Sequence, residues 1–408
     1  MKGICVKSEI KPLKKVLLHR PGRELLNLTP DTLSELLFDD IPFLRVAQEE
    51  HDAFAQTLRD NGVEVVYLED LMTEVLTGRP ELTKPFLYQW LTEGNVVTQR
   101  WQDKLYDYLC SHYEGKALVE KTMEGITLRE LPHLSAYSLQ DMTAAPDDLV
   151  VRPMPNLYFT RDPFASVGNG ILLNRMRFPN RRRETIYADY IFKYHPDFSG
   201  CVPRYYDRSY HGSIEGGDIL NLTDETVAIG LSERTSPDGI EAAARLLFKD
   251  PTAKVRTVLA FSIPSCRAFM HLDTVFTQVD VDRFTIHPAI LGPLTVYEIT
   301  PGNVHDGLRI RRIYADLESV LAFHTGMDRV KLIPCGGGDP IAAAREQWND
   351  GSNTLCLAPG KIIVYQRNEV TNQILRDEGL EVLEIPSAEL SRGRGGPRCM
   401  SMPLIREV

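Results

Sequence analysis

Two stretches near opposite ends of the chain repeat one pattern, and this repeat constrains the fold more than any other feature. Residues 58–68 read LRDNGVEVVYL and residues 375–385 read LRDEGLEVLEI. Each combines the polar end of a helix, a glycine that stops it and an alternating strand. Weaker units of a helix followed by a strand lie at residues 184–206, 240–261 and 316–334. Five such units predict an α/β fold in which repeated modules are arrayed around an axis.

Residues 71–148 interrupt this pattern. The aromatic and leucine residues of FLYQWL and KLYDYLCSHY have a spacing that favours helices. We therefore predict one α/β domain formed by residues 1–70 and 149–408, and an α-helical insertion formed by residues 71–148. Polar breaks such as EGGD, HLD and GGGD follow several of the predicted strands, and loops at one end of such an array can converge.

Charge and composition argue against several functions. The formal net charge of -10 and the pI near 5.6 disfavour a nucleic-acid partner, because phosphate binding needs a basic surface. No stretch approaches 18 apolar residues, and the N-terminal residues lack the apolar core of a signal peptide. We expect a cytoplasmic protein with a small-molecule partner and no membrane partner. The sequence is also compatible with a homo-oligomer.

Among the seven cysteines, which form no CxxC pair, Cys399 differs in its surroundings. It lies in RGRGGPRCMSMPL, where the glycines give a backbone that can bend or move. Arg394 and Arg398 supply positive charge that we expect to lower the pKa of the thiol. An RGG-like element that touches RNA is the alternative, but such elements work as repeats in polar segments, and here apolar MSMPLI follows one copy. The segment therefore predicts a reactive cysteine.

A nucleophilic thiol needs a partner for proton transfer. His271 lies in FMHLDTVFTQVDV, where strand alternation predicts that His271 and Asp273 share one face. Glu215 in SIEGGDIL and Asp162 in NLYFTRDPF are acids in apolar, glycine-punctuated surroundings. A thiol, an imidazole and several carboxylates together suit a planar cation such as guanidinium, which carboxylates bind through paired hydrogen bonds.

Four segments closely resemble the arginine deiminases, a family of guanidine-group modifying enzymes. They are residues 155–176, 214–220, 270–277 and 392–404, and residues 8–22 are similar as well. The resemblance runs over essentially the whole chain. It implies a five-fold pseudosymmetric α/β propeller of ββαβ modules with a helical insertion. It also implies hydrolysis of L-arginine to L-citrulline and ammonia, in the arginine dihydrolase pathway, without a metal or an organic cofactor.

The resemblance also implies a role for each matching residue. Cys399 matches the nucleophile, His271 the general acid and base, Glu215 the acid that orients the histidine, and Asp162 and Asp273 the pair that holds the guanidinium. Asn156, Arg181 and Arg234 match positions that bind the α-carboxylate, and Arg394 matches a residue on a mobile closing loop. In this mechanism the thiolate attacks the guanidinium carbon, the histidine protonates the departing ammonia, and water then hydrolyses a covalent thiouronium.

Other functions stay open at this point. An amidinotransferase passes the amidino group to an amine, and another guanidine hydrolase accepts agmatine or a methylarginine. Arg181 and Arg234 count against agmatine, which has no carboxylate. A noncatalytic guanidine-binding protein needs neither Cys399 nor His271. A papain-like hydrolase is disfavoured because the CGSCW context is absent.

Overall fold

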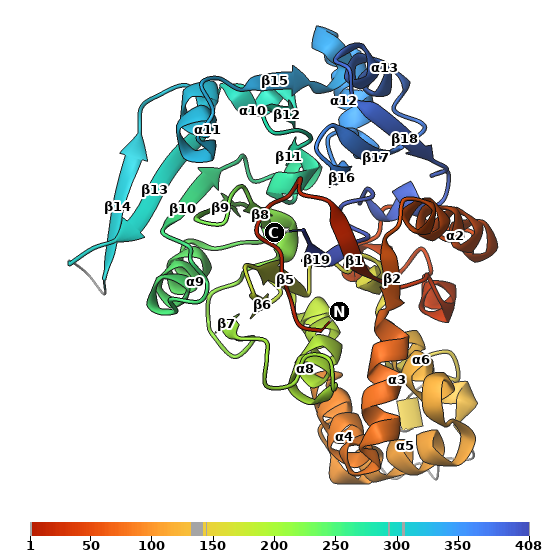
Figure 1. Cartoon of the computed structure of the whole chain (residues 1–408). Coiled ribbons are helices and arrows are strands. Elements are labelled where there is room, and N and C mark those ends of the chain that lie inside the picture. The colour runs from red at the N-terminus through yellow and green to blue at the C-terminus, as the bar shows by residue number, and fades with distance from the viewer. Residues whose placement is uncertain (1, 132–141, 144, 293, 304–306, 408) are drawn as a thin grey trace.

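The computed structural model describes residues 2–131, 142–143, 145–292, 294–303 and 307–407. Within these residues, five sheets share one plan, in which an antiparallel pair of strands is extended by a third strand parallel to its neighbour (Figure 1). The sheets contain β19 (Met402–Arg406), β1 (Leu13–Leu18) and β2 (Glu64–Tyr67); β5 (Phe164–Val167), β6 (Gly170–Leu173) and β7 (Arg204–Tyr206); β8 (Ile219–Asn221), β9 (Thr226–Leu231) and β10 (Thr257–Ser262); β11 (Phe276–Gln278), β12 (Arg283–Ile286) and β15 (Lys331–Pro334); and β16 (Leu355–Ala358), β17 (Lys361–Tyr365) and β18 (Glu381–Ile385).

A helix precedes the parallel strand of each sheet, because parallel neighbours need a crossover connection. These helices are α2 (Leu44–Asp60), α8 (Thr185–Tyr194), α9 (Pro237–Lys249), α11 (Leu317–Thr325) and α13 (Glu369–Asp377). The five helix-then-strand units predicted from the sequence are therefore present, and the α/β class is confirmed.

Helix α2 illustrates why these units fold as they do. Its buried apolar residues include Ala47, Phe54 and Leu58, which recur at the spacing of one helical face. That face packs against β2 and β18. The helix ends at Asp60, and Gly62 has a φ of 76°, a left-handed conformation that glycine adopts without steric cost.

Further elements extend this plan. Strands β13 (Thr295–Pro301) and β14 (Leu308–Ile313) add to the sheet of β8, β9 and β10, and project from one side of the molecule in Figure 1. Other helices in the described residues are α1 (Leu33–Leu36), α10 (Pro288–Leu291) and α12 (Pro340–Trp348). None of the helices in the described ranges is both long enough and apolar enough to cross a membrane.

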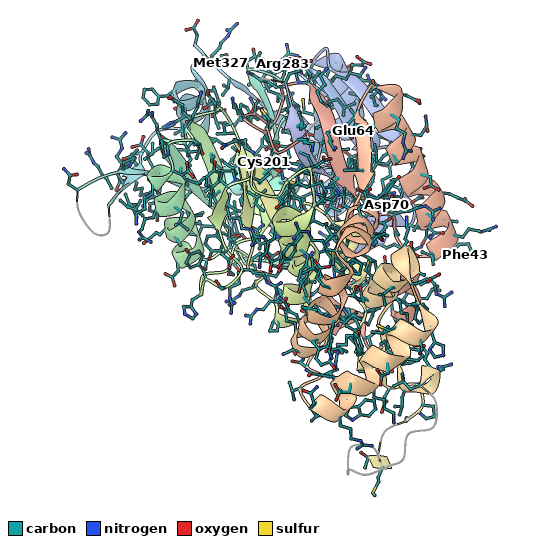
Figure 2. The ribbon with its side chains drawn as sticks, turned by 60° about the horizontal axis from the view of Figure 1, so that its bottom comes forward. Phe43, Glu64, Asp70, Cys201, Arg283 and Met327 are labelled. Carbon is teal, nitrogen blue, oxygen red and sulfur yellow. The ribbon has the colours of Figure 1, made fainter. Side chains whose placement is uncertain are left out.

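Most of the predicted insertion consists of helices, which gather at the lower end of the molecule in Figure 1. They are α3 (Leu68–Gly78), α4 (Thr83–Glu93), α5 (Gln99–His112) and α6 (Gly115–Glu124). Asp70 of α3, labelled in Figure 2, forms an ion pair with Lys116 of α6 at 2.7 Å. The predicted range also includes residues 132–141 and 144, which lie outside the described residues.

The helices of this segment share their core with the neighbouring sheet. Phe86 of α4 and Tyr190 of α8 lie 5.3 Å apart between ring centroids, and both belong to a buried cluster that includes Phe164 of β5. Strand β3 (Ile126–Thr127), which follows α6, pairs antiparallel with β4 (Leu149–Val151), which follows the predicted insertion. The helices therefore pack against the α/β part through apolar side chains.

Strands from both ends of the chain form one sheet. β19 pairs antiparallel with β1, and β1 pairs parallel with β2. Cys399 lies just before β19, so this pairing fixes the segment that carries the predicted nucleophile.

Candidate active site

The candidate site is built from corresponding positions of the five sheets. In each case a turn or short 3₁₀ helix leads into the first strand, and a polar residue of the site lies within it or directly beside it. These residues are Asp162 before β5, Glu215 before β8, His271 and Asp273 before β11, Asn353 before β16 and Cys399 before β19. All six are buried, with exposed fractions of 0–5%. The predicted residues Asp162, Glu215, His271, Asp273 and Cys399 thus occupy corresponding places in the fold.

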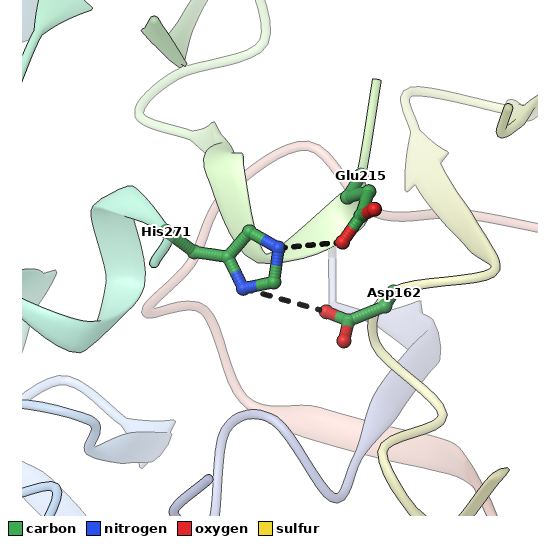
Figure 3. Close-up of side chains that lie close together, drawn as sticks. All are labelled: Asp162, Glu215 and His271. Carbon is green, nitrogen blue, oxygen red and sulfur yellow. Dashed lines mark hydrogen bonds and ion pairs between the residues drawn. The ribbon is translucent and has the colours of Figure 1, made fainter. Parts of the chain in front are cut away.

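His271 is held between two acids (Figure 3). Its Nε2 atom lies 2.8 Å from Oε2 of Glu215, and its Nδ1 atom lies 3.9 Å from Oδ1 of Asp162. Burial opposes protonation of the ring, but Asp162 and the hydrogen bond to Glu215 outweigh it and raise the pKa of His271 to about 9. The imidazole is therefore a cation at neutral pH.

Close packing explains one glycine of the EGGD motif. A Cβ atom on Gly217 would lie 2.7 Å from the ring of His271, so only glycine allows the imidazole to reach Glu215. The predicted strand at residues 271–273 is wrong, because residues 272–274 form a 3₁₀ helix and β11 begins only at Phe276. His271 and Asp273 reach the site from this turn, where strand alternation does not apply.

Two arginines neutralise these acids. Nη1 of Arg181 lies 3.0 Å from Oδ2 of Asp162, and its Nε and Nη2 atoms bind Glu184 at 2.9 and 2.8 Å. Nη1 of Arg234 lies 3.5 Å from Oε2 of Glu215. Burial opposes ionisation of Glu215, but Arg234 and the bond to His271 lower its pKa to about 2. The structure thus brings Arg181 and Arg234 to the acid cluster.

Cys399 lies beside a second group of polar residues. Its sulfur is 3.2 Å from Nδ2 of Asn353 and 3.6 Å from Oδ2 of Asp273. Burial raises the pKa of the thiol well above its usual value, and Asp273 and Asp162 raise it further. The sequence-based expectation of a lowered thiol pKa is therefore wrong for this state, since the opposing effect of Arg398 is the smaller one.

Arg398 binds the carboxylate of Asp273, which lies next to the sulfur. Its Nη1 atom donates to Oδ2 of Asp273 at 2.7 Å, its Nε atom lies 3.1 Å from Oε2 of Glu9, and its Nη2 atom donates to the carbonyl of Ile219 at 2.8 Å. Two acids and a carbonyl therefore share this guanidinium, which explains its small effect on the sulfur.

Each of the two aspartates predicted to hold a guanidinium has one carboxylate oxygen that can accept a hydrogen bond from a ligand. Oδ2 of Asp162 accepts from Arg181, and Oδ2 of Asp273 accepts from Arg398. Within the described residues, the Oδ1 atoms of both aspartates are buried without a hydrogen-bond partner. Unpaired buried acceptors are costly, so the site is suited to a cationic ligand with several N–H donors.

Asn156 and Arg394 lie in segments that pack against residues 28–43 and α12. Nδ2 of Asn156 donates to the carbonyl of Leu36 at 2.8 Å. The guanidinium carbon of Arg394 lies 3.5 Å from the ring centroid of Trp348, and its Nη1 atom lies 3.6 Å from Oδ2 of Asp39. Arg394 has a φ of 63°, a left-handed conformation that is uncommon for residues other than glycine.

The glycines of the Cys399 segment also have a packing role that the sequence did not indicate. None of Gly393, Gly395 and Gly396 has a left-handed φ. Instead, a Cβ atom on Gly396 would lie 2.8 Å from both oxygens of Asn353, and one on Gly395 would lie 2.3 Å from the ring of Phe159. These glycines allow close packing around the cysteine.

Sequence reasoning missed three residues that position this site. They are Asn353, Glu184 and Asp218. Oδ1 of Asp218 accepts from the backbone N–H of Leu272, next to His271, and its Oδ2 atom accepts from the hydroxyls of Ser232 and Thr235. Burial raises the pKa of Asp218 to about 6. One feature of the sequence could have identified Asn353. It lies just before the first strand of its sheet, and the predicted residues hold corresponding positions in the other four sheets.

Asp162, Glu215 and His271 also offer ligand atoms within 4.8 Å of one another, a spacing that can hold a metal ion. The surrounding charge disfavours this use. Arg181 and Arg234 already compensate the two carboxylates, and the raised pKa of His271 keeps its ring protonated. A metal ligand must be the neutral imidazole, so a metal would have to compete with a proton and two guanidinium groups.

The matching family model and two relatives of this chain carry the same name, arginine deiminase. The family model described as arginine deiminase matches residues 34–406. Arginine deiminase of Treponema denticola is 57% identical over 407 residues, which cover 100% of this chain and 99% of that protein. Arginine deiminase of Clostridium perfringens is 54% identical over 408 residues, which cover 100% and 98%.

Solved structures share the fold at much lower identity. A DDAH from Pseudomonas aeruginosa, complexed with citrulline, aligns with a TM-score of 0.53 at 16% identity and covers 96% of this chain and 99% of its own. SxtG, an amidinotransferase from Microseira wollei, aligns with a TM-score of 0.55 at 14% identity and covers 99% and 98%. These likenesses concern the fold alone.

Proposed function

The chain belongs to the arginine deiminase family, and on this premise we propose that it hydrolyses L-arginine to L-citrulline and ammonia with Cys399 as the nucleophile. The observation that carries the proposal is a pair of buried oxygens, Oδ1 of Asp162 and Oδ1 of Asp273, that accept no hydrogen bond from any described residue. A guanidinium placed between them supplies the missing donors and the compensating charge.

The substrate itself activates the thiol in this proposal. The pKa of Cys399 is raised by burial and by Asp273 and Asp162, so the resting sulfur carries its proton at neutral pH. A bound guanidinium adds one positive charge between these two acids. That charge favours the thiolate, and the thiol proton passes to water.

The thiolate then attacks the guanidinium carbon. Glu215 occupies Nε2 of His271, so Nδ1 is the nitrogen that faces Asp162 and the bound guanidinium. His271 transfers the Nδ1 proton to the departing nitrogen, the C–N bond breaks, and ammonia leaves. A thiouronium remains on Cys399.

Neutral His271 next takes a proton from water. The water oxygen bonds to the same carbon, the C–S bond breaks and its electron pair returns to sulfur. The remaining proton on that oxygen passes to water, which leaves the carbonyl group of citrulline. Proton transfer of this kind contributes typically about 10² to 10⁴ in rate. No other group is needed to stabilise the leaving ammonia.

Arg234 is the best-supported ligand for the α-carboxylate. Its Nε atom is buried without a partner in the described part of the chain, and its guanidinium carbon lies 4.7 Å from the ring centroid of Phe178. Arg181 is engaged by Glu184 and Asp162, so we expect it to exchange partners when a carboxylate enters. Asn156 completes the proposed carboxylate site, and Arg394 is proposed to lie on a segment that moves to admit substrate to these buried groups.

The finer features of the fold belong to the same proposal. We propose that the five sheets are the modules of a five-fold pseudosymmetric propeller, supported by the corresponding positions of the site residues. Residues 1–70 and 149–408 are the proposed catalytic domain, and residues 71–148 the proposed insertion. A cytoplasmic location and a homo-oligomer are compatible with this enzyme.

The test is direct. Purified protein is incubated with L-arginine in the presence of a chelator, and citrulline and ammonia are measured. We expect equal amounts of both products. Parallel incubations with agmatine, a methylarginine, and arginine with glycine as amine acceptor separate the related reactions. Formation of a transferred amidino product without ammonia would favour an amidinotransferase instead.

A further inference from the structure

We propose that Asn353 is a catalytic residue whose side-chain amide donates a hydrogen bond to the sulfur of Cys399 and stabilises its thiolate. The inference rests on the proposed role of Cys399 as nucleophile. It adds a residue that neither the motifs nor their spacing indicated.

The orientation of the amide follows from its surroundings. Oδ1 of Asn353 accepts from the backbone N–H of Cys399 at 3.1 Å, and Nδ2 donates to the backbone carbonyl of Asp273 at 3.0 Å. Each of these partners can play only one role, because an N–H donates and a carbonyl accepts. Nδ2 is therefore the atom that faces the sulfur, at 3.2 Å.

The sulfur needs such a donor. Among the described residues, its other side-chain hydrogen-bond partner is Oδ2 of Asp273, at 3.6 Å, and this carboxylate repels a thiolate. A buried charge without a hydrogen-bond donor is strongly disfavoured. Asn353 supplies a donor without adding a charge, so it stabilises the thiolate and leaves the aspartates free for the cationic substrate.

Packing holds Asn353 in place. Its side chain is completely buried, and its backbone N–H donates to the carbonyl of Asp350 at 2.9 Å. Gly396 packs directly on its oxygens, as the position of a Cβ atom shows. Asn353 therefore reaches the sulfur without having to be ordered by substrate.

The hydrogen bond has a defined place in the reaction. When the thiouronium is hydrolysed, the C–S bond breaks and its electron pair returns to sulfur. The sulfur becomes negatively charged at that moment, and the side-chain N–H of Asn353 donates a hydrogen bond to it. Asn353 thus acts on both the formation and the release of the thiolate.

Two substitutions separate this role from simple packing. Asn353→Asp keeps an acceptor for the Cys399 N–H but replaces the donor with an acidic group. Asn353→Ala removes both. A packing role predicts that Asp is the milder change, whereas the donor role predicts that Asp disturbs the thiol more.

The measurement follows alkylation of Cys399 by iodoacetamide as a function of pH, without arginine, by mass spectrometry of the tryptic peptide 399–406. We expect the rate at pH 8 to fall about tenfold in Asn353→Ala, the size of one hydrogen bond to a charged group, and further in Asn353→Asp. The matched control is Asn349→Asp, whose amide donates to the carbonyl of Arg345. It should leave the alkylation profile unchanged.

An unchanged profile in folded Asn353→Ala, or a milder effect in Asn353→Asp, overturns the proposal. Circular dichroism identifies variants that are unfolded. The assay needs no turnover, so it fails independently of the proposed function, which is rejected separately if Cys399→Ala remains active.

Discussion

Nη1 of Arg398 lies 2.7 Å from Oδ2 of Asp273, so the residue next to the predicted nucleophile orients the carboxylate that we propose binds the substrate. Glu9 binds the other side of the same guanidinium. The alignment of Asp273 thus depends on the segment that carries Cys399, and any shift of that segment also moves the acid.

Loss of the nucleophile should abolish turnover while leaving the fold intact. We expect Cys399→Ala to lose citrulline formation by several orders of magnitude, because the residue acts chemically. The control is Cys110→Ala, which removes an exposed thiol on α5. During wild-type turnover, a rapid acid quench should trap an adduct on peptide 399–406. Near-normal activity of Cys399→Ala would disprove the covalent mechanism.

The aspartates should control binding. Asp273→Ala or Asp162→Ala removes one carboxylate from the bound cation and one from a buried arginine, which keeps Glu9 or Glu184, and we expect a cost on the order of 3 to 5 kcal/mol. Calorimetric titration of arginine into the Cys399→Ala background measures this loss without turnover. Asp52→Ala, which removes an exposed pair with Arg20, should change arginine affinity by less than about 1 kcal/mol. Unaltered affinity in either site variant would reject its assignment.

The pH dependence of kcat/KM should reflect the ionisation of His271. Its pKa is raised from the usual 6.5 to about 9, so its ion pairs stabilise the fold fully below pH 6.5 and lose that contribution as the pH rises through 9. Glu215→Gln removes the bonded carboxylate and should shift the alkaline limb of kcat/KM to lower pH. Glu74→Gln, which alters a partly exposed pair with His195, should leave the profile in place. An alkaline limb that does not move in Glu215→Gln contradicts the role of this histidine.

Arg234 should select for the α-carboxylate. We expect wild type to prefer arginine over agmatine by several powers of ten in kcat/KM. Arg234→Gln should lower the arginine value more than the agmatine value, by roughly 1.5 to 3 kcal/mol for a charge-assisted bond. Arg312→Gln, on the exposed face of β14, is the control. Equal effects on the two substrates would remove Arg234 from the carboxylate site.

Close packing at Gly396 gives a prediction for stability. Gly396→Ala forces a Cβ atom against Asn353 and should destabilise the fold by about 1 to 3 kcal/mol. Gly78→Ala, at the end of α3 where a Cβ atom meets open space, should be neutral or stabilising by up to about 1 kcal/mol. Chemical denaturation of both variants measures the difference. If Gly396→Ala and Gly78→Ala were equally stable, the segment around Cys399 would have to shift and accommodate the added methyl group without loss of stability.

Several residues of the candidate site could be proposed from the sequence because their chemistry is unusual. Cys399, His271 and Glu215 stood out because thiols, imidazoles and acids in apolar, glycine-rich surroundings are rare. Asn353 and Glu184 did not, because these residue types are common in turns and helices for purely local reasons. Only the repeated architecture, with a polar residue before each first strand, distinguishes Asn353.

The predictions that failed concern relations in space. Arg398 adjoins Cys399 in sequence, but its side chain points to Asp273 and Glu9, so adjacency gave the wrong direction for the thiol pKa. The alternation after His271 belongs to β11, which begins at Phe276, and not to the turn before it. Helix-then-strand units were predicted well because their periodicity is local, while burial and charge depend on residues distant in the chain.

The pairing of β19 with β1 sets the order in which activity can appear as the chain is made. β1 and β2 emerge early from synthesis, yet their sheet lacks its third strand until residues 402–406 follow. Contacts between such distant segments form late, because closing a long loop costs entropy. A nascent chain can therefore hold its early modules in partly folded form, and it gains Cys399, the proposed nucleophile, together with its last strand. We expect no partial product of synthesis to release ammonia from arginine.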